Sequence, residues 1–214
     1  MSTTTSVPII QPTPESLTNN EPNNTRTHLL AIGYQLIAQK GFTAVGIKQI
    51  LDTAGVPKGS FYHYFASKET FGEAIIKHYF TNYKKRLDAI GNSQNINAQQ
   101  KLYNYFQNWY DTQQNGCNHE KCLVVKLSAE VADMSEPMRI ALDNGRAQTI
   151  DWISEQIKAG WVDNSIPPQD NIGAESIAKR WYFAWLGASL IAKISQTNTP
   201  LAEVWQMTTT QLGR

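Results

Sequence analysis

The sequence has few cysteines, no basic N-terminus and no long apolar run. Its two cysteines, Cys117 and Cys122, cannot provide the disulfide framework on which small secreted domains rely. The first basic residue is Arg26, so the N-terminus lacks the basic start of a secretory signal. The longest apolar stretch, residues 181–194, is interrupted by Lys193 and is shorter than the roughly 20 apolar residues that a membrane-spanning helix needs. These absences predict a soluble, cytoplasmic protein with no membrane partner.

An excess of either charge is also missing from the chain as a whole, whose formal net charge is +1. The distribution is nevertheless uneven. Residues 25–90 contain nine basic and four acidic side chains, whereas residues 1–24 and residues 91–214 each have a small acidic excess. This asymmetry predicts a polyanion-binding surface in the N-terminal third. A basic face that is only solvated is the alternative interpretation.

Apolar residues recur with helical spacing nearly everywhere, and no run alternates with period two for long enough to form a convincing strand. The sequence therefore predicts an all-α fold. Residues 1–24 are dominated by Ser, Thr, Asn and Pro, which is typical of a disordered tail. We expect a three-helix N-terminal domain over residues 25–72, with Thr25 as the first N-cap, and a second helical domain over residues 73–214.

Two short helices are predicted close together in the N-terminal domain, over residues 47–54 and 58–65. Gly55 can adopt the left-handed conformation that ends a helix, and Pro57 suits the first turn of the next one. Ser67 is then a good N-cap for a long amphipathic helix. Two short helices separated by three residues are typical of a helix-turn-helix motif.

The third predicted helix carries residue types that suit DNA binding. Phe61 and Phe65 are four positions apart, so we expect both to face the core. Lys, Ser and Tyr side chains donate hydrogen bonds to phosphates or base edges, and glycine allows close approach of a backbone. The positions left for the surface are Lys58, Gly59, Ser60, Tyr62, His63 and Tyr64. An aromatic cluster that simply packs is the alternative.

The stretch from Gly41 to Phe71, GFTAVGIKQILDTAGVPKGSFYHYFASKETF, resembles the DNA-binding domain of the TetR family of transcriptional regulators. The resemblance rests on the spacing of Gly55, Lys58, Gly59, Tyr62, Phe65 and Lys68. It implies that the major groove of double-stranded operator DNA is contacted by Lys58, Gly59, Ser60 and His63. It also implies that the DNA backbone is held by Tyr62, Tyr64 and Lys68. The chain departs from the family at Gly46, where Thr or Ser is usual, and at Tyr64, where His is common.

The rest of the chain resembles the electrophile-responsive branch of this family. The matching segments are CLVVKLSAEVADMSEPMR, from Cys122, and WLGASLIAKIS, from Trp185. The resemblance implies a homodimeric repressor that releases its operator when a reactive compound is sensed, with Cys122 as the sensor and Lys193 associated with it. The residues themselves add that Lys121 adjoins Cys122 and that nearby cations lower the pKa of a thiol. An inert buried thiol and a lysine that reaches solvent remain the alternatives.

The apolar run over residues 181–194 places Ala184, Ala188 and Ala192 in one row at four-residue spacing. Small residues in a row allow two helices to approach closely. We expect this helix to form a four-helix dimer interface together with the last helix of the chain. A helix that is purely internal to one subunit is the alternative.

Other functions fit the sequence less well. A second hypothesis keeps the DNA-binding half but replaces covalent sensing by an apolar ligand in a cavity lined by Tyr103, Phe106, Trp109, Tyr110 and Trp152. A third is a helical enzyme that uses Cys122, His119 or the acids Glu120, Glu130 and Asp133. Zinc at Cys117, His119 and Cys122 lacks the usual fourth ligand and paired spacing. We therefore expect no metal, no cofactor and no catalytic residue.

Overall fold

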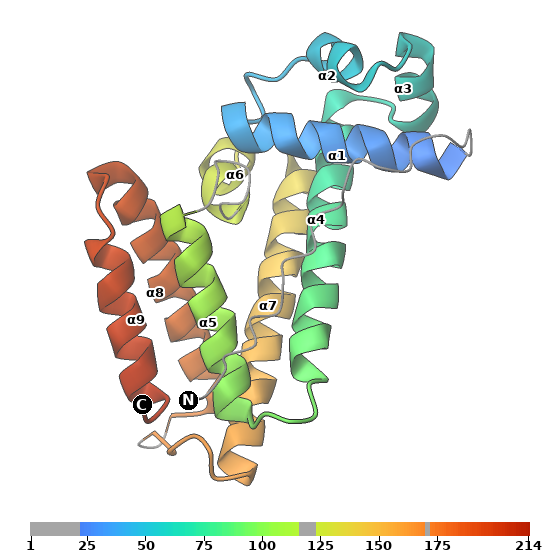
Figure 1. Cartoon of the computed structure of the whole chain (residues 1–214). Helices are drawn as coiled ribbons and strands as arrows, with labels where there is room; N and C mark the ends of the chain where they lie inside the picture. Colours follow the sequence, from blue (N-terminus) through green and yellow to red (C-terminus); the bar gives the residue numbers. More distant parts are fainter. Residues whose placement is uncertain (1–21, 116–122, 170–171) are drawn as a thin grey trace.

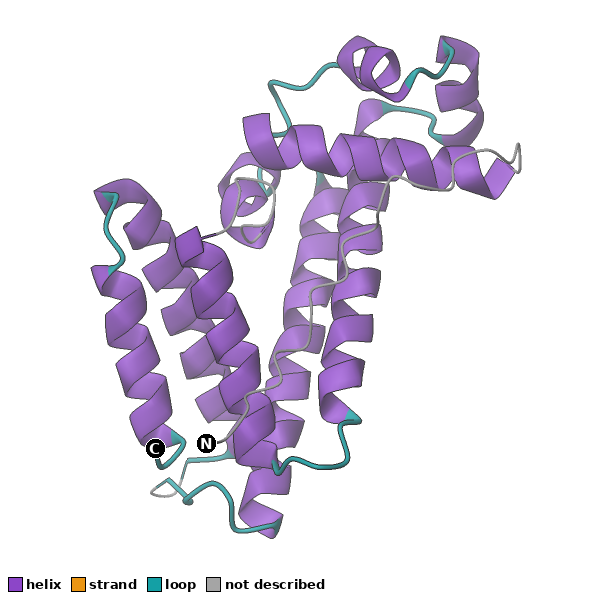
Figure 2. Cartoon of the chain, viewed as in Figure 1, coloured by secondary structure: helices purple, strands orange, loops and turns teal. Residues whose placement is uncertain are grey.

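The structure is a computed structural model that describes residues 22–115, 123–169 and 172–214 (Figure 1). These residues form helices and no strands (Figure 2), so the all-α prediction is confirmed. The bounds of the helices are α1 Pro22–Lys40, α2 Ile47–Ala54, α3 Lys58–Tyr64, α4 Lys68–Gly91, α5 Ala98–Asn115, α6 Leu123–Val131, α7 Glu136–Val162, α8 Ala174–Ser195 and α9 Thr199–Gln211.

The N-terminal helices α1, α2 and α3 form a layer at one end of the molecule, and α1 crosses the ends of α4 and α7 (Figure 1). Helices α4 and α7 run side by side, and α5, α8 and α9 form the other half of the larger domain. Helix α6 lies beneath the C-terminal end of α1. Helix α4 passes without a break through the predicted domain boundary at residues 72 and 73, which makes it a continuous link between the two parts.

The first helix begins earlier than predicted. It starts at Pro22, so Thr25 lies within its first turns and is not an N-cap. Proline is favourable in the first turn because its ring fixes a helical φ and its missing N–H has no partner to lose there. The helix ends as predicted before Gly41, whose φ of 90° is left-handed. Of the predicted tail, residues 1–21 lie outside the described residues.

The helix-turn-helix has nearly the predicted bounds. Gly55 ends α2 with φ 64° and ψ 30°, and the ring nitrogen Nε2 of His28 lies 3.1 Å from the Ala54 carbonyl oxygen, which ties α2 to α1. Pro57 is the extended N-cap of α3, one position before the helix, and Phe65 is extended beyond its end. The next helix begins as predicted, because the Ser67 hydroxyl accepts a hydrogen bond from the Thr70 amide at 3.2 Å.

Two apolar clusters fill the molecule. We call the first the N-terminal core; it joins α1 to α4 with α6 and the start of α7. Its largest members are phenylalanines, namely Phe42, Phe61, Phe65, Phe71 and Phe80. We call the second the C-terminal core; it joins α5, α7, α8 and α9. Its largest members are Phe106, Trp109, Trp181, Tyr182 and Trp185. The N-terminal core therefore includes helices from both predicted domains.

The approach of α4 to α7 depends on glycines, of which Gly145 of α7 has the closest contact. A Cβ atom on Gly145 would lie 2.2 Å from the ring of Phe80, so no other residue fits there without displacing that ring. The same reason keeps Gly33 of α1 free of a side chain, because a Cβ there would lie 2.4 Å from Phe71. These contacts fix the distance between α4 and its neighbours.

The predicted row of small residues on α8 does not face outward. Ala184, Ala188 and Ala192 are half-buried and pack against the C-terminal core. The residues that α8 exposes to solvent include an apolar row of Phe183, Gly187, Leu190, Ile191 and Ile194. Sequence spacing identified an apolar helix but not its rotation, because both faces are apolar. Within the described ranges, no helix is long and apolar enough to cross a membrane.

Candidate DNA-binding surface and effector-sensing region

Helix α3 is anchored by its phenylalanines and exposes the residues between them. Phe61 is 0% exposed and Phe65 is 1% exposed, so the prediction that both face the core is confirmed. Lys58, Gly59 and His63 are exposed. Tyr62 is also exposed, at 46% of its surface, which is unusual for a large aromatic residue. A short helix held by one buried face thus presents a mixed polar and aromatic surface to solvent.

Two glycines on this surface are not required by the packing of the protein. A Cβ atom on Gly59 or on Gly46 would meet nothing within 4 Å. Neither residue has the positive φ that favours glycine. Gly59 therefore leaves space for a partner outside the chain, in keeping with the predicted close approach of DNA. Gly46, at the start of α2, supplies no side-chain cap and no hydroxyl for a phosphate contact.

The remaining predicted contacts differ in how free they are. The Lys58 ammonium lies 5.8 Å from the centroid of the Tyr62 ring and shares its exposed surface. Ser60 and Tyr64 are half-buried. The Tyr64 ring packs against the N-terminal core and lies edge-to-face with the His63 ring, with 4.8 Å between the ring centroids. Tyr64 therefore has a structural role in α3, and less of its side chain is available to DNA than of Tyr62 or His63.

Lys68 lies in the first turn of α4 and is partly engaged within the protein. Its Nζ donates to the Thr43 carbonyl oxygen at 3.3 Å and lies 4.6 Å from the centroid of the Phe42 ring. An ammonium group has three N–H donors, so one bond to a carbonyl leaves others for an external anion. The side chain is half-buried, which places its charge beside the loop between α1 and α2.

Sequence reasoning did not assign two further residues to this end of the molecule; it named Glu130 only as an acid of the enzyme hypothesis. Arg26, in α1, is exposed, and its guanidinium lies 5.4 Å from the centroid of the Phe65 ring, next to the end of α3. Its position beside α3 depends on how α1 crosses the motif, so no local pattern identifies it. Glu130, at the end of α6, binds the loop between α1 and α2. The sequence offered no signal for this contact, which joins positions 87 and 88 residues apart.

The predicted sensor residues are only partly within the described structure. Cys122 lies outside the described residues, as do Cys117 and His119. Helix α5 ends at Asn115 and α6 begins at Leu123, both at the end of the larger domain that faces the layer of α1, α2 and α3 (Figure 1). Helix α8, which ends at Ser195, also ends there. Lys193 is exposed in the last turn of α8, which agrees with the alternative of a lysine that reaches solvent, and its association with Cys122 stays a prediction. In the described part of the chain, no cluster of three or more His, Cys, Asp or Glu could hold a metal.

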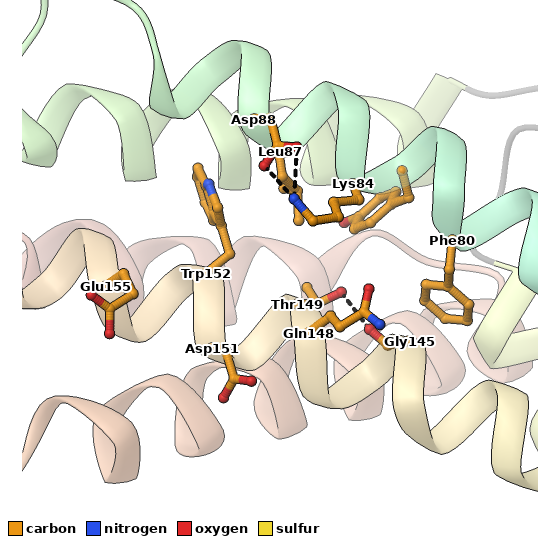
Figure 3. Close-up of a pocket in the computed structure, with 11 residues that line it drawn as sticks. Phe80, Lys84, Leu87, Asp88, Gly145, Gln148, Thr149, Asp151, Trp152 and Glu155 are labelled. Atoms are coloured by element: carbon orange, nitrogen blue, oxygen red, sulfur yellow. Dashed lines mark hydrogen bonds and ion pairs between the residues drawn. The ribbon is translucent and has the colours of Figure 1, made fainter.

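The aromatic cavity predicted for a reversible ligand is filled by packing. Phe106 is fully buried and stacks on Trp185 with a centroid distance of 5.2 Å, and the Trp109 indole donates to the Ser189 hydroxyl at 3.1 Å. A cavity of about 270 Å³ lies instead between α4 and α7 (Figure 3). Its wall includes Trp152 but otherwise consists of residues outside the predicted set, both apolar (Phe80, Tyr83, Leu87) and polar (Lys84, Asp88, Gln148, Thr149, Asp151, Glu155). Lys84 and Asp88 form an ion pair at its edge.

Comparison with known proteins decides the family. Residues 29–75 match the family described as bacterial regulatory proteins, tetR family, and residues 98–208 match the tetracyclin repressor-like C-terminal domain. The chain belongs to the TetR family. It is 42% identical over 187 residues to the HTH-type transcriptional repressor NemR of Escherichia coli strain K12, which covers 84% of this chain and 89% of NemR.

Other TetR-family proteins are similar along most of the chain. The crystal structure of the reduced form of E. coli NemR superposes with a TM-score of 0.80 at 40% identity, covering 86% of this chain and 94% of that one. The transcriptional regulator AcuR of Cereibacter sphaeroides is 28% identical over 177 residues, covering 81% of this chain and 78% of AcuR. The predicted resemblance is therefore confirmed for both parts of this TetR-family protein.

Proposed function

We propose that the protein is a homodimeric repressor that binds a near-palindromic operator through α3 and releases it when an electrophile or oxidant modifies Cys122. The observation that supports DNA binding is the exposed face of α3, which is formed by Lys58, Gly59, Tyr62 and His63. Buried phenylalanines hold this helix against the core. Two such helices in a two-fold dimer read two half-sites about 34–36 Å apart or a near multiple of that distance. A repressor of this kind works in the cytoplasm, where its operator is.

The dimer is supported by the outer face of α8. Phe183, Leu190, Ile191 and Ile194 are 46% exposed or more, and Gly187 between them would accept a close neighbour. Exposed apolar residues in one row mark a contact surface, and a two-fold contact requires the same surface on both subunits. Gly187→Arg should leave the fold intact and turn the dimer into a monomer in sedimentation, whereas Ser176→Arg on the same helix should not. A Gly187→Arg dimer at low concentration would move the interface elsewhere.

The switch is supported by where the helices on either side of Cys122 end. Helix α5 ends and α6 begins at the end nearest the layer of α1, α2 and α3, and α8, whose last turn contains Lys193, also ends there (Figure 1). A cation near a thiol favours the reactive thiolate. The crystal structure of E. coli NemR is that of its reduced form. With a maleimide, the thiolate sulfur would form a bond to one alkene carbon and the other carbon would take a proton from water.

The decisive experiment measures operator release after treatment with N-ethylmaleimide, together with mass spectrometry of each cysteine. We expect the wild type and Cys117→Ser to lose affinity by about 5- to 150-fold, which is the usual size of a coupling between two sites. Cys122→Ser should keep its affinity. If Cys122→Ser releases DNA as readily as the wild type does, the thiol is not the sensor.

The cavity between α4 and α7 favours a second candidate function, a TetR-family repressor induced by a small apolar ligand. Its volume of about 270 Å³ and its aromatic wall suit a compound of one or two rings. Such a ligand would release the operator from Cys122→Ser and from the wild type equally. Replacing Thr149 with Trp would fill the cavity and abolish only this response.

A further inference from the structure

A carboxylate on α6 holds the loop that leads into the helix-turn-helix. Glu130 Oε2 accepts a hydrogen bond from the Phe42 amide at 2.9 Å, and its Oε1 accepts one from the Thr43 amide at 2.5 Å. The two amides are consecutive, so the carboxylate grips the peptide chain with both oxygens. Gly41 makes room for it, because a Cβ there would lie 2.9 Å from Oε2.

The first turn of α4 completes the contact. Lys68 Nζ donates to the carbonyl oxygen of Thr43, the residue whose amide binds Glu130. The Thr43 hydroxyl also lies 3.7 Å from the sulfur of Met134, just beyond α6. Thr43 is thus bound from both α4 and the region of α6. We call Glu130, Lys68 and the Phe42–Thr43 peptide the loop clasp.

The charge of Glu130 is favoured where it lies. Burial raises the pKa of its carboxyl, but the hydrogen bonds from Thr43 and Phe42 and the nearby charge of Lys68 lower it by more, so the pKa lies below its ordinary value of 4.5. Hydrogen bonds to a charged group are about twice as strong as those between neutral groups. The clasp is therefore formed at neutral pH.

The apolar residues of α6 belong to the same core as Phe42 but supply no directional contact. Val124, Leu127 and Val131 are buried in the N-terminal core, which also contains residues of α1 to α4 and the start of α7. Apolar packing resists separation of the helices but specifies their relative position less strictly than hydrogen bonds do. The clasp supplies that position, because two amides and two oxygens pair in one geometry only.

We infer that Glu130 is a positioning residue that couples α6 to the helix-turn-helix and holds α3 in its operator-binding orientation. Helix α6 begins at Leu123, one residue after the proposed sensor Cys122, so a change at the thiol reaches Glu130 along a single helix of nine residues. The coupling to Cys122 rests on the proposed function. The positioning of α3 requires only that the protein binds DNA.

The test compares Glu130→Ala with Glu136→Gln, a control that also removes one carboxylate charge. Glu136 lies in the first turn of α7, is exposed and pairs with its neighbour Arg139, so its replacement removes a nearby charge but no clasp. Full-length dimers are studied at a temperature at which circular dichroism shows each variant to be folded. The measurements are hydrogen exchange of the Phe42 and Thr43 amides, operator affinity, and the loss of affinity on N-ethylmaleimide treatment.

In Glu130→Ala we expect faster exchange at both amides and an operator affinity about tenfold lower, while Glu136→Gln matches the wild type. N-ethylmaleimide should change the affinity of Glu130→Ala by less than about fivefold, below the ordinary range for coupled sites, although mass spectrometry shows Cys122 modified as in the wild type. Glu130→Gln, which keeps one acceptor oxygen, should fall between the two.

The outcomes separate this inference from the proposed function. Unchanged operator affinity in folded Glu130→Ala would overturn the positioning role, even with faster exchange. Lower affinity but a full wild-type response to N-ethylmaleimide would overturn the coupling role. If the wild type itself does not respond to N-ethylmaleimide, the proposed sensor fails, whereas the affinity of Glu130→Ala still decides whether Glu130 positions α3.

Discussion

The two apolar cores differ in how their members are held. In the C-terminal core, indole N–H groups of α5 and α8 donate to hydroxyl and amide oxygens: Trp109 to Ser189, Trp185 to Thr208 and Trp181 to Gln211. The N-terminal core consists mainly of phenylalanines and aliphatic residues, and its directional bonds include those of the loop clasp and the one between His28 and the Ala54 carbonyl oxygen.

This difference assigns a mechanical role to each part. A buried indole that loses its acceptor is left unpaired at a cost of about 1–3 kcal/mol, so α5, α8 and α9 are held in register. Apolar side chains can change neighbours without leaving a polar atom unpaired. We therefore expect the C-terminal core to act as a fixed frame and the N-terminal core to be the part in which helices shift more easily.

The largest expected effect comes from breaking the frame. Trp185 is fully buried, stacks on Phe106 and is bonded to Thr208. Trp185→Ala should lower the free energy of unfolding by about 3–5 kcal/mol, as truncation of a buried aromatic residue does. Urea denaturation at fixed protein concentration measures it, with exposed Lys179→Ala as the control. A loss below about 1 kcal/mol would contradict the frame.

A smaller change tests the hydrogen bonds alone. Thr208→Val keeps the shape of the side chain but leaves the Trp185 indole, which now donates to the Thr208 hydroxyl at 3.0 Å, without that acceptor. We expect a loss of about 1–3 kcal/mol in the same denaturation experiment. Thr210→Val, at an exposed position of α9, should change little. Equal effects in both variants would mean that packing alone holds the frame.

In the shifting part, the largest effect of a single change should be on DNA and not on stability. Lys68→Ala removes an ammonium group from the first turn of α4, which follows α3, together with the hydrogen bond that this group donates to the Thr43 carbonyl oxygen. We expect weaker binding to all sequences and a salt slope reduced by about 1, as for one lost phosphate contact. Lys77→Ala, farther along α4 and paired with Glu73, is the control. An unchanged slope would remove Lys68 from the phosphate contacts.

The pH dependence of stability gives the smallest effect. The folded pKa of Glu130 lies below its unfolded value, so its ionised form stabilises the folded state. That contribution is fully present above the unfolded pKa of about 4.5 and is lost as the pH falls through the folded pKa. The difference in unfolding free energy between the wild type and Glu130→Gln should therefore be constant near neutral pH and shrink below pH 4.5. A difference that stays constant into acid would contradict it.

Sequence reasoning reached the parts of the fold that short-range patterns determine. The bounds of α2 and the burial of Phe61 and Phe65 follow from spacing within a dozen residues. The predicted start of α1 was wrong because the residues that follow Pro22 are polar and resemble a disordered tail. The helix is stabilised instead by the burial of Leu29 and Leu30, two turns after its start. Local composition does not register that distant packing.

The sites were predictable to different degrees for the same reason. The exposed residues of α3 lie on one short helix, so their arrangement follows from helical geometry. The outward face of α8 could not be predicted, since the choice between Ala188 and Gly187 depends on where α9 packs. The contact of Glu130 was even harder to predict from the sequence, because its partners are backbone groups, which every residue has. Cys122 stays a prediction, since it lies outside the described residues.

The loop clasp has a consequence for how such regulators diversify. Glu130 recognises peptide groups, so the side chains at positions 42 and 43 are not what it reads, and any residue but proline offers it an N–H. The positions of α3 that we predict to contact bases, Lys58, Ser60 and His63, are separate from the loop clasp. Substitutions there can therefore leave the peptide groups that Glu130 binds unchanged.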